Sequence, residues 1–448
     1  MTGLHTDLYE LTMAAGYVAA GKASELATFE LFLRRLPANR NFVLAAGLEQ
    51  AAQYLLDLSY STEEIGYLRS LPQLANAPEA FFELLRDFRF TGDLFAVPEG
   101  TPVFAGEPLL TVRAPIVEAQ IPETWLLAMI GFQSMIASKA ARVVEAASGR
   151  AVVEFGTRRA HSPEAGLLGA RAAYIGGCVG TSNTEAGFRY SIPVFGTAAH
   201  SWVQSFVSET ESYRRLQQLL GPATVYLIDT YDTLEGARIA VELGKPLWGV
   251  RLDSGNLADT SAQVRRILDQ GGLQDARIMV SGDLNEYRIL ELVAGGAPVD
   301  SFGVGTDLST STDAPSLGSV YKLVEMEVQG IKRYTAKFSQ EKQTLPGAKQ
   351  IFRYPDHDVV GCSWECPACP PGASPCEALL RPVILGGKLV EPLPGVAQAR
   401  ERAAASLRKL PPICRSLYDL DHPYRVEYSP ELLALYQNAK QSMRTATS

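Results

Sequence analysis

The strongest constraint on the fold is a repeat of apolar strand, polar turn and helix that begins after Gly149. Short apolar segments that predict strands lie at 151–155, 225–228, 247–252, 278–280 and 301–304. Helical patterns lie between several of them, at 233–243, 257–268 and 285–294. Strands that alternate with helices at this spacing are typical of parallel α/β folds. The middle of the chain is therefore predicted to be an α/β domain.

Each predicted strand runs into a turn rich in glycine, hydroxyl and carboxylate groups. These turns are Glu154-Phe155-Gly156, Asp229-Thr230, Asp253-Ser254-Gly255, Ser281-Gly282-Asp283 and Gly303-Val304-Gly305-Thr306-Asp307. Parallel α/β folds bind their ligands at the carboxyl ends of the strands. Several separate turns must converge there on one small volume, and a barrel explains this better than an open sheet. We therefore predict an α/β barrel with a ligand site at one rim.

The segments on either side of this region follow other patterns. Residues 27–33 alternate as a strand does, and 92–115 predicts short strands separated by Pro/Gly turns. A helical pattern covers 117–147, with a break expected near Pro122. After about Lys337 the α/β rhythm is lost. We predict three domains: a β-rich N-terminal α+β domain over 1–115, an α/β barrel domain over 116–336, and a C-terminal extension over 337–448 that packs on the N-terminal domain.

The charge of the chain argues against two classes of partner. With 49 acidic and 41 basic residues, a formal net charge of −8 and no long basic run, neither nucleic acid nor an anionic membrane is expected as its main partner. No signal peptide is recognisable, and the most apolar window, 124–137, is too short to span a bilayer. Six cysteines do not indicate a disulfide scaffold. We expect a cytoplasmic protein.

His200 lies among small residues in the run GTAAHSW (196–202) and is one of only five histidines in the chain. Imidazole is the side chain best able to act as base, nucleophile or phosphate acceptor near neutral pH. The turns at 281–283 and 303–306 contain glycines, whose open backbone amides are typical of anion sites. A histidine together with phosphate-binding turns suggests phosphoryl chemistry.

Two further motifs allow both a functional and a purely structural interpretation. Asp253, with Ser254 and Gly255, could hold ribose hydroxyls or a metal, but the same three residues could equally cap the helix that follows. Phe155 could stack on a flat ring and Arg158 could reach a phosphate, or they could be a buried aromatic and a surface cation. The residues alone leave both alternatives open.

A cysteine-rich loop follows in the C-terminal extension. Its four cysteines are Cys362, Cys366, Cys369 and Cys376. Cysteines this close together, with one C-x₂-C pair, could bind a structural Zn²⁺, although the other spacings are looser than those of a zinc finger. The alternative is a solvated loop with free thiols.

Taken together, six motifs resemble the nicotinate phosphoribosyltransferase family. They are TDLYELTM (6–13), EFGTRRAHSPEA (154–165), GTSN (180–183), GTAAHSW (196–202), GVRLDSG (249–255) and FGVGTDL (302–308). The resemblance implies an irregular TIM-like α/β barrel and a homodimer with shared active sites. It also implies the transfer of phosphoribosyl from phosphoribosyl pyrophosphate to nicotinate, which yields nicotinate mononucleotide and pyrophosphate in the salvage of NAD. ATP and Mg²⁺ would take part.

The same resemblance implies roles for single residues. His200 would be transiently phosphorylated by ATP, and Asp253 would hold the ribose hydroxyls. Tyr9, reaching in from a neighbouring subunit, and Phe155 would sandwich the pyridine ring. The other substrate-binding residues would be Thr197 beside nicotinate, Arg251 at its carboxylate or the adjacent phosphate, Gly282, Gly305 and Thr306 at the 5′-phosphate, Arg158 near phosphate, and Ser182, Ser254, Gly255 and Gly303. Asn256 stands where the family usually has aspartate.

Three alternatives stay open at this point. Enzymes on the same fold that use nicotinamide carry an aspartate about where Ser182 stands, and a carboxylate there would repel nicotinate. Quinolinate phosphoribosyltransferases are much shorter chains without a phosphorylated histidine. A non-catalytic homologue that binds nucleotide is the third possibility, although His200, Arg251 and Asp253 are all present.

Overall fold

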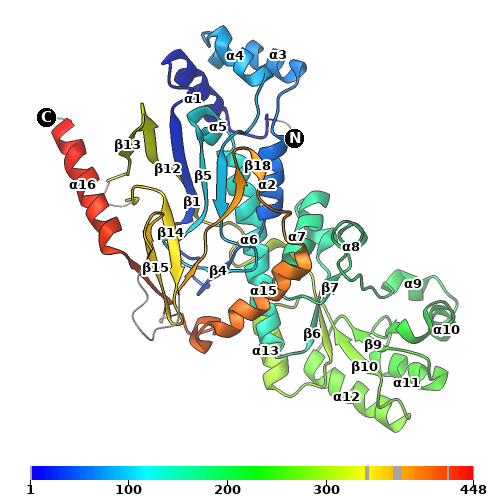
Figure 1. The fold of residues 1–448 in the computed structure, drawn as a ribbon. Coiled ribbons are helices and arrows are strands. Elements are labelled where there is room, and N and C mark those ends of the chain that lie inside the picture. The colour runs from blue at the N-terminus through cyan, green and yellow to red at the C-terminus, as the bar shows by residue number, and fades with distance from the viewer. Residues whose placement is uncertain (1–2, 339–342, 367–375, 421–422, 447–448) are drawn as a thin grey trace. The chain divides into compact units, whose positions relative to one another are not determined.

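The computed structural model describes residues 3–338, 343–366, 376–420 and 423–446 (Figure 1). The chain divides into two compact units, one formed by Met1–Ser134, Ser316–Gly395 and Ala405–Ser448, the other by Met135–Pro315 and Val396–Ala404. The division falls inside the helix α6 (Glu123–Ala146). Both ends of the chain therefore belong to the first unit.

The first unit is built on a seven-stranded sheet whose paired strands are antiparallel. In spatial order the strands are β13 (Ile331–Tyr334), β12 (Ser319–Val328), β1 (Leu26–Leu33), β5 (Pro108–Pro115), β3 (Asp93–Ala96), β17 (Arg381–Leu385) and β18 (Lys388–Leu389). The predicted strand at 27–33 is thus confirmed as β1. Its side chains are buried along most of its length, because helices of the same unit supply further apolar residues to the core.

Two smaller sheets and several helices complete this unit. The sheets consist of β16 (Glu377–Ala378), β14 (Lys349–Arg353), β15 (His357–Cys362) and β19 (Arg425–Tyr428), and of β2 (Val43–Leu44) with β4 (Pro102–Val103). The helices are α1 (Leu8–Ala19), α2 (Leu48–Asp57), α3 (Thr62–Ser70), η1 (Pro72–Leu74), α4 (Glu79–Arg86), α5 (Ile116–Gln120), η4 (Pro412–Arg415) and α16 (Pro430–Ala446). The helix α15 (Val396–Lys409) is shared between the units. The break expected near Pro122 separates α5 from α6.

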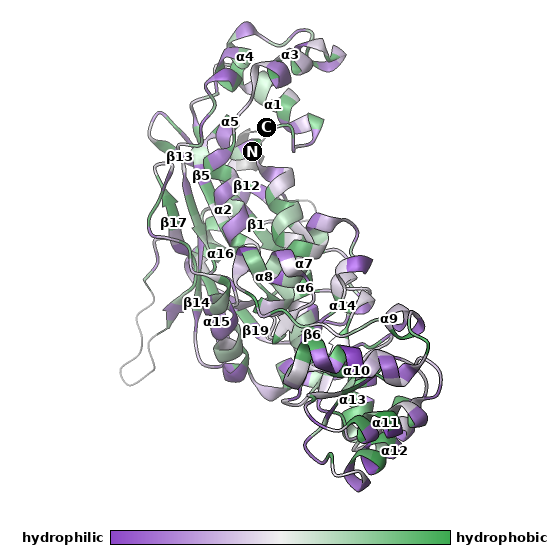
Figure 2. Ribbon diagram, turned by 90° about the vertical axis from the view of Figure 1, so that its right-hand side faces the viewer, coloured by the Kyte–Doolittle hydropathy of each residue, from purple (hydrophilic) through white to green (hydrophobic). Residues whose placement is uncertain are grey.

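The second unit contains a six-stranded sheet in which all neighbouring strands are parallel. Its order is β7 (Gly180–Thr181), β6 (Ala151–Glu154), β11 (Ser301–Val304), β10 (Arg277–Val280), β9 (Gly249–Leu252) and β8 (Val225–Leu227). Its helices are η2 (Thr157–Arg159), α7 (Pro163–Ile175), α8 (Thr184–Tyr190), α9 (His200–Gln204), α10 (Glu209–Leu220), η3 (Gly221–Ala223), α11 (Thr233–Leu243), α12 (Leu257–Gln270), α13 (Glu286–Ala294) and α14 (Thr306–Thr310). Hydrophilic and hydrophobic residues alternate along α11 and α12, as expected for helices that cover a sheet with one face (Figure 2).

The parallel α/β architecture is therefore confirmed, but the closed barrel is not found among the described strands. The sheet ends at β7 and β8, which pair with β6 and β9 and not with each other. The strand β7 has only two residues, and beyond it the chain makes a single isolated bridge, between Thr181 and Val194. So short an edge offers few backbone groups with which to close the sheet.

The described cysteines of the C-terminal loop do not gather into a metal site. Cys362 is buried at the end of β15, whereas Cys366 is exposed and Cys376 partly exposed. Burial and the Glu365 carboxylate raise the pKa of the Cys362 thiol to about 12, so this thiol is protonated at neutral pH when no metal is bound. Cys369 lies outside the described residues. No group of three or more metal-ligating side chains occurs in the described part of the chain, and zinc binding stays a prediction.

None of the helices in the described ranges is both long enough and apolar enough to cross a membrane.

Candidate active site

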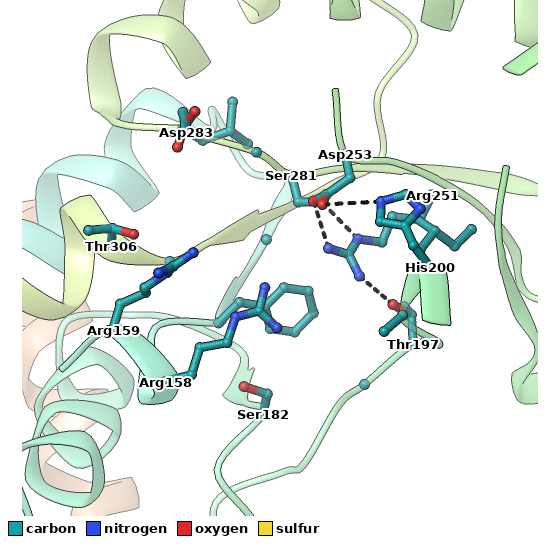
Figure 3. A pocket seen from close by; sticks show the side chains of 18 of the residues that line it. Arg158, Arg159, Ser182, Thr197, His200, Arg251, Asp253, Ser281, Asp283 and Thr306 are labelled. Carbon is teal, nitrogen blue, oxygen red and sulfur yellow. Dashed lines mark hydrogen bonds and ion pairs between the residues drawn. The ribbon is translucent and has the colours of Figure 1, made fainter. Parts of the chain in front are cut away.

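A pocket of about 630 Å³ lies in the second unit, at the carboxyl ends of the strands of the parallel sheet (Figure 3). Its lining includes these predicted site residues: Phe155, Arg158, Ser182, Thr197, His200, Arg251, Asp253, Gly282, Gly303, Gly305 and Thr306. Ser254 and Gly255 are adjacent to the lining in sequence but do not belong to it. Tyr9 belongs to the first unit, on α1.

Arg251, on the strand β9, is held by three hydrogen bonds (Figure 3). Its Nη1 donates to Thr197 Oγ1 over 2.6 Å, its Nη2 to Asp253 Oδ1 over 2.6 Å, and its Nε to Ser281 Oγ over 2.8 Å. The guanidinium carbon also lies 5.6 Å from the centre of the Phe155 ring, within the range of a cation–π contact. The cation is therefore fixed in one orientation beside an aromatic face.

His200 begins the short helix α9, and its side chain is 41% exposed. Its Nδ1 lies 3.1 Å from Thr230 Oγ1. Its Nε2 lies 4.0 Å from Asp229 Oδ1 and 3.9 Å from Asp253 Oδ2. A ring that contacts a hydroxyl on one side and two carboxylates on the other is oriented, yet still open to a ligand, as a general base or phosphate acceptor must be.

Asp229 lies in one of the turns predicted at the rim, but no role was predicted for it. Its carboxylate is 2% exposed. Asp229 Oδ2 accepts a hydrogen bond of 3.0 Å from the backbone N–H of Asp253 and one of 2.6 Å from Ser254 Oγ. Ser254, predicted to bind substrate, thus contacts Asp229 instead of lining the pocket. The two aspartates are thereby held together where β8 and β9 end.

The structure also shows which residue caps the helix after the Asp253 turn. The residue that caps α12 is Asn256, whose side chain accepts a hydrogen bond from the backbone N–H of Asp259. Asp253 lines the pocket and does not cap the helix. Asn256, which stands where the family usually has aspartate, therefore caps a helix in this chain.

Two glycines, one in the turn after β10 and one on the neighbouring strand β11, lie so close to other residues that a side chain would not fit. A side chain on Gly282, whose φ is +90°, would place its Cβ 1.9 Å from the carbonyl oxygen of Asp253. At Gly303, on β11, a Cβ would lie 2.5 Å from the Phe155 ring. Only glycine keeps these two approaches open without moving the neighbours.

Arg159 and Asp283 also line the pocket in this region, and no role was predicted for either, although the turn that contains Asp283 was predicted at the rim. Figure 3 shows Arg158, Arg159, Asp283 and Thr306 around the part of the pocket away from His200. Arg159 follows Arg158 on the turn η2, and both side chains are exposed. The signal for Arg159 was present in the Arg-Arg pair. Asp283 has a φ of +46°, which aspartate tolerates better than most residues and which sequence does not reveal.

Family models for nicotinate phosphoribosyltransferase match most of the chain. The model of the family's N-terminal domain matches residues 4–131, that of the family itself 151–342, and that of its C-terminal domain 371–436. The chain belongs to the nicotinate phosphoribosyltransferase family. The predicted family, and with it the prediction that the chain is an enzyme, is confirmed.

Similar proteins of this family occur in bacteria and animals. A nicotinate phosphoribosyltransferase of Mycobacterium tuberculosis is 42% identical over 442 residues, which cover 96% of this chain and 92% of that protein. The human nicotinate phosphoribosyltransferase is 34% identical over 517 aligned residues, with 96% and 95% covered. The crystal structure of the human enzyme matches with a TM-score of 0.83 at 30% identity, covering 97% of this chain and 99% of that one. A nicotinate-nucleotide pyrophosphorylase from Pyrococcus furiosus matches with a TM-score of 0.73 at 28% identity, covering 91% and 95%.

Proposed function

We propose that the protein transfers the phosphoribosyl group of phosphoribosyl pyrophosphate to nicotinate, in a reaction of NAD salvage that is coupled to ATP. The observation that carries the proposal is the convergence of His200, Arg251 and Asp253 on one pocket, in a chain of this family. The products are nicotinate mononucleotide and pyrophosphate.

Nicotinate binding is assigned to the part of the pocket around Phe155 and Arg251. The Phe155 ring offers an aromatic surface for the pyridine ring, and Arg251 beside it offers the positive charge that a carboxylate needs. Ser182 also lines the pocket and carries no charge that would repel nicotinate. We therefore assign the carboxylate to Arg251.

In the transfer step, the bond from ribose C1 to the pyrophosphate oxygen breaks and a bond from C1 to the pyridine nitrogen forms. The ribosyl group passes through a state with positive charge, so catalysis depends on positioning and on electrostatic stabilisation. Asp253 would hold the ribose hydroxyls, and the backbone at Gly282 and Gly305 would hold the 5′-phosphate. Support for this comes from the pocket lining, where Arg158 and Arg159 add two cations.

His200 would accept the γ-phosphoryl group of ATP. One imidazole nitrogen bonds to phosphorus while the bond from phosphorus to the bridging oxygen breaks and ADP leaves; water later releases phosphate. The exposure of the ring and its contact with Thr230 support this role, since the imidazole is held but not covered. The phosphorylated ring would add negative charge next to Asp229 and Asp253, which demands a counter-ion.

The residues present fit Mg²⁺ as this counter-ion. Asp229 Oδ1 is buried and makes no hydrogen bond with any described residue, and Asp253 lies beside it. Mg²⁺ is usually held by one or two carboxylates together with substrate phosphates, so a protein cage of three ligands is not needed. Bound there, Mg²⁺ would neutralise phosphate charge during transfer.

We further propose a cytoplasmic homodimer in which Tyr9 completes the pocket of the partner. Tyr9 is 46% exposed on α1, and Leu8 and Met13 nearby are also exposed, as expected of residues that meet another chain.

The direct test is an assay of purified protein with nicotinate, Mg²⁺ and phosphoribosyl pyrophosphate, with and without ATP. We expect nicotinate mononucleotide from wild type, more of it with ATP, and no stimulation by ATP in the His200→Ala variant. Nicotinamide serves as the control substrate. Turnover of nicotinamide alone would assign the chain to the nicotinamide-using enzymes, and no turnover of either would indicate a non-catalytic homologue.

A further inference from the structure

Lys139, on α6 within the second unit, is buried with 1% of its side chain exposed. Its ammonium contacts three carboxylates: Glu286 at 2.5 Å, Asp313 at 3.0 Å and Asp307. An ammonium has three N–H donors, so each donor can serve one carboxylate. Lysine is rarely buried without such pairing.

The three carboxylates come from separate segments, and each segment is next to the pocket lining. Asp307 lines the pocket itself, directly after Thr306. Asp313 follows Thr312, and Glu286 begins α13 two residues after Leu284; both neighbours belong to the lining. One buried ammonium thus joins α14 and the turn after it to the start of α13, beside the glycine turns of the pocket.

A second cation strengthens the cluster. Arg142 Nε donates to Glu286 Oε1 over 3.1 Å, and Arg142 Nη2 donates to the Tyr287 hydroxyl over 3.0 Å. Glu286 is fully buried and is held by both cations. Burial by itself would lower the pKa of Lys139, but Glu286 and its other acidic neighbours raise it above the usual value, so Lys139 carries its charge at neutral pH.

The cluster also bears on the binding of an anion. Without Lys139, the Asp307 carboxylate would face the pocket uncompensated and would repel a phosphate bound at the adjacent Thr306. Lys139 therefore has two effects. It holds the segments that carry its three carboxylate partners, and it neutralises the negative charge of Asp307, which would repel a phosphate.

We propose that Lys139 is a positioning residue for the phosphate-binding end of the pocket, acting through Asp307, Asp313 and Glu286. The inference rests on the proposed function, because that function assigns the 5′-phosphate to this end. Lys139 itself is not in the pocket lining, so its effect reaches the substrate only through its partners.

The test compares three ligands in wild type and in the variants Lys139→Met and Asp313→Asn. Ribose 5-phosphate probes the glycine-turn end, pyrophosphate probes the end near His200, and nicotinate probes the aromatic side. We expect the inhibition constant of ribose 5-phosphate and the KM for phosphoribosyl pyrophosphate to rise about 10-fold or more in Lys139→Met and about 3-fold in Asp313→Asn. The constants for nicotinate and pyrophosphate should change by less than about 2-fold.

The matched control is Lys245→Met, which removes a lysine–aspartate pair from the surface of the same unit, where Lys245 and Asp275 are 56% and 86% exposed. It should leave all three ligands unaffected. If Lys139→Met does not fold, the ligand constants of Asp313→Asn test the proposal. Unchanged binding of ribose 5-phosphate in folded variants, or an equal loss for all three ligands, would overturn the proposal. Failure of the wild type to bind ribose 5-phosphate would instead count against the proposed function.

Discussion

Each nitrogen of the Arg251 guanidinium has a hydrogen-bond partner in the second unit, and these partners come from different segments of the chain. Ser281, which follows β10, donates to Asp253 Oδ1 over 2.5 Å while it accepts from Arg251 Nε. The arginine and the aspartate are thus oriented before any substrate arrives. Preorganisation of this kind lowers the reorganisation that a reaction requires.

The preference of the enzyme for nicotinate over nicotinamide is predicted to depend on Ser182. We expect Ser182→Asp to lower kcat/KM for nicotinate by about 10-fold or more, because a carboxylate in the pocket lining repels the carboxylate of the substrate. Ser182→Ala, which adds no charge, should change it by less than about 3-fold. The measurement is steady-state kinetics with nicotinate and nicotinamide. Equal losses in the two variants would contradict the electrostatic explanation.

Asp229 is predicted to matter for the coupling to ATP. In Asp229→Asn, one oxygen that accepts from Asp253 N–H and Ser254 Oγ is replaced or reoriented, and the carboxylate beside His200 is lost. We expect stimulation by ATP to fall about 10-fold, with a smaller change in the rate without ATP. The control is Asp232→Asn, which retains a good N-cap at the start of α11. Equal effects on both rates would argue against a specific role.

The regular spacing of the apolar segments, and the polar and glycine turns between them, sufficed to predict most strands of the parallel sheet. The strand predicted at 301–304 is β11, and Pro122 separates α5 from α6 as expected. The predicted closure into a barrel is not found, because it depends on pairing between the edge strands β7 and β8, which are distant in sequence and do not pair with each other. Lys139 also escaped prediction, since one lysine in a helical pattern gives no sign of its three acidic partners.

The turn after β10 is predicted to require glycine. In Gly282→Ala, the Cβ would meet the Asp253 carbonyl oxygen, and φ would stay in the left-handed region, so the turn must move. We expect kcat/KM to fall about 100-fold while the protein stays folded by circular dichroism. Gly196→Ala is the matched control, because Gly196 lines the same pocket with open space around it. An active Gly282→Ala variant would show that the turn tolerates displacement.

The packing of α1 predicts a pH-dependent stability of the first unit. Glu10 is buried, and its Oε1 accepts hydrogen bonds of 3.0 and 2.7 Å from the backbone N–H and the hydroxyl of Thr124 in α6. Burial raises the pKa of Glu10 to about 7, against about 4.3 in an unfolded chain. The folded state therefore binds the proton more tightly, and this stabilisation is complete below about pH 4.3 and lost as the pH rises through 7.

The variant Glu10→Gln separates the contribution of Glu10 to the pH dependence of stability from the contributions of the other ionisable groups. Its unfolding free energy relative to wild type should increase by about 2.5 kcal/mol between pH 5 and pH 8, since glutamine does not ionise. Denaturant unfolding at both pH values measures the difference. Glu63→Gln, on the exposed surface of α3, should show no such change with pH. A pH-independent effect of Glu10→Gln would mean that Glu10 is ionised in the folded protein throughout this range.

The chain's two units divide the predicted site residues unequally. All described lining residues of the pocket belong to 155–312, whereas Tyr9 belongs to the other unit. If Tyr9 completes the pocket of a partner subunit, Tyr9→Ala and His200→Ala damage contributions from different chains to one site. A mixed dimer of the two variants then contains one site with both defects and one with none.

Co-expression of the two variants tests this arrangement. Each variant alone should have little ATP-stimulated activity, while co-expressed, differently tagged chains should regain about a quarter of the ATP-stimulated activity of wild type, because random pairing makes half of the dimers mixed and each mixed dimer has one intact site. Pairing His200→Ala with Asp253→Ala is the control and should restore nothing, since both residues line the same pocket of one chain. A mixture of Tyr9→Ala and His200→Ala that stays inactive, or a fully active Tyr9→Ala, would mean that each chain builds its pocket alone.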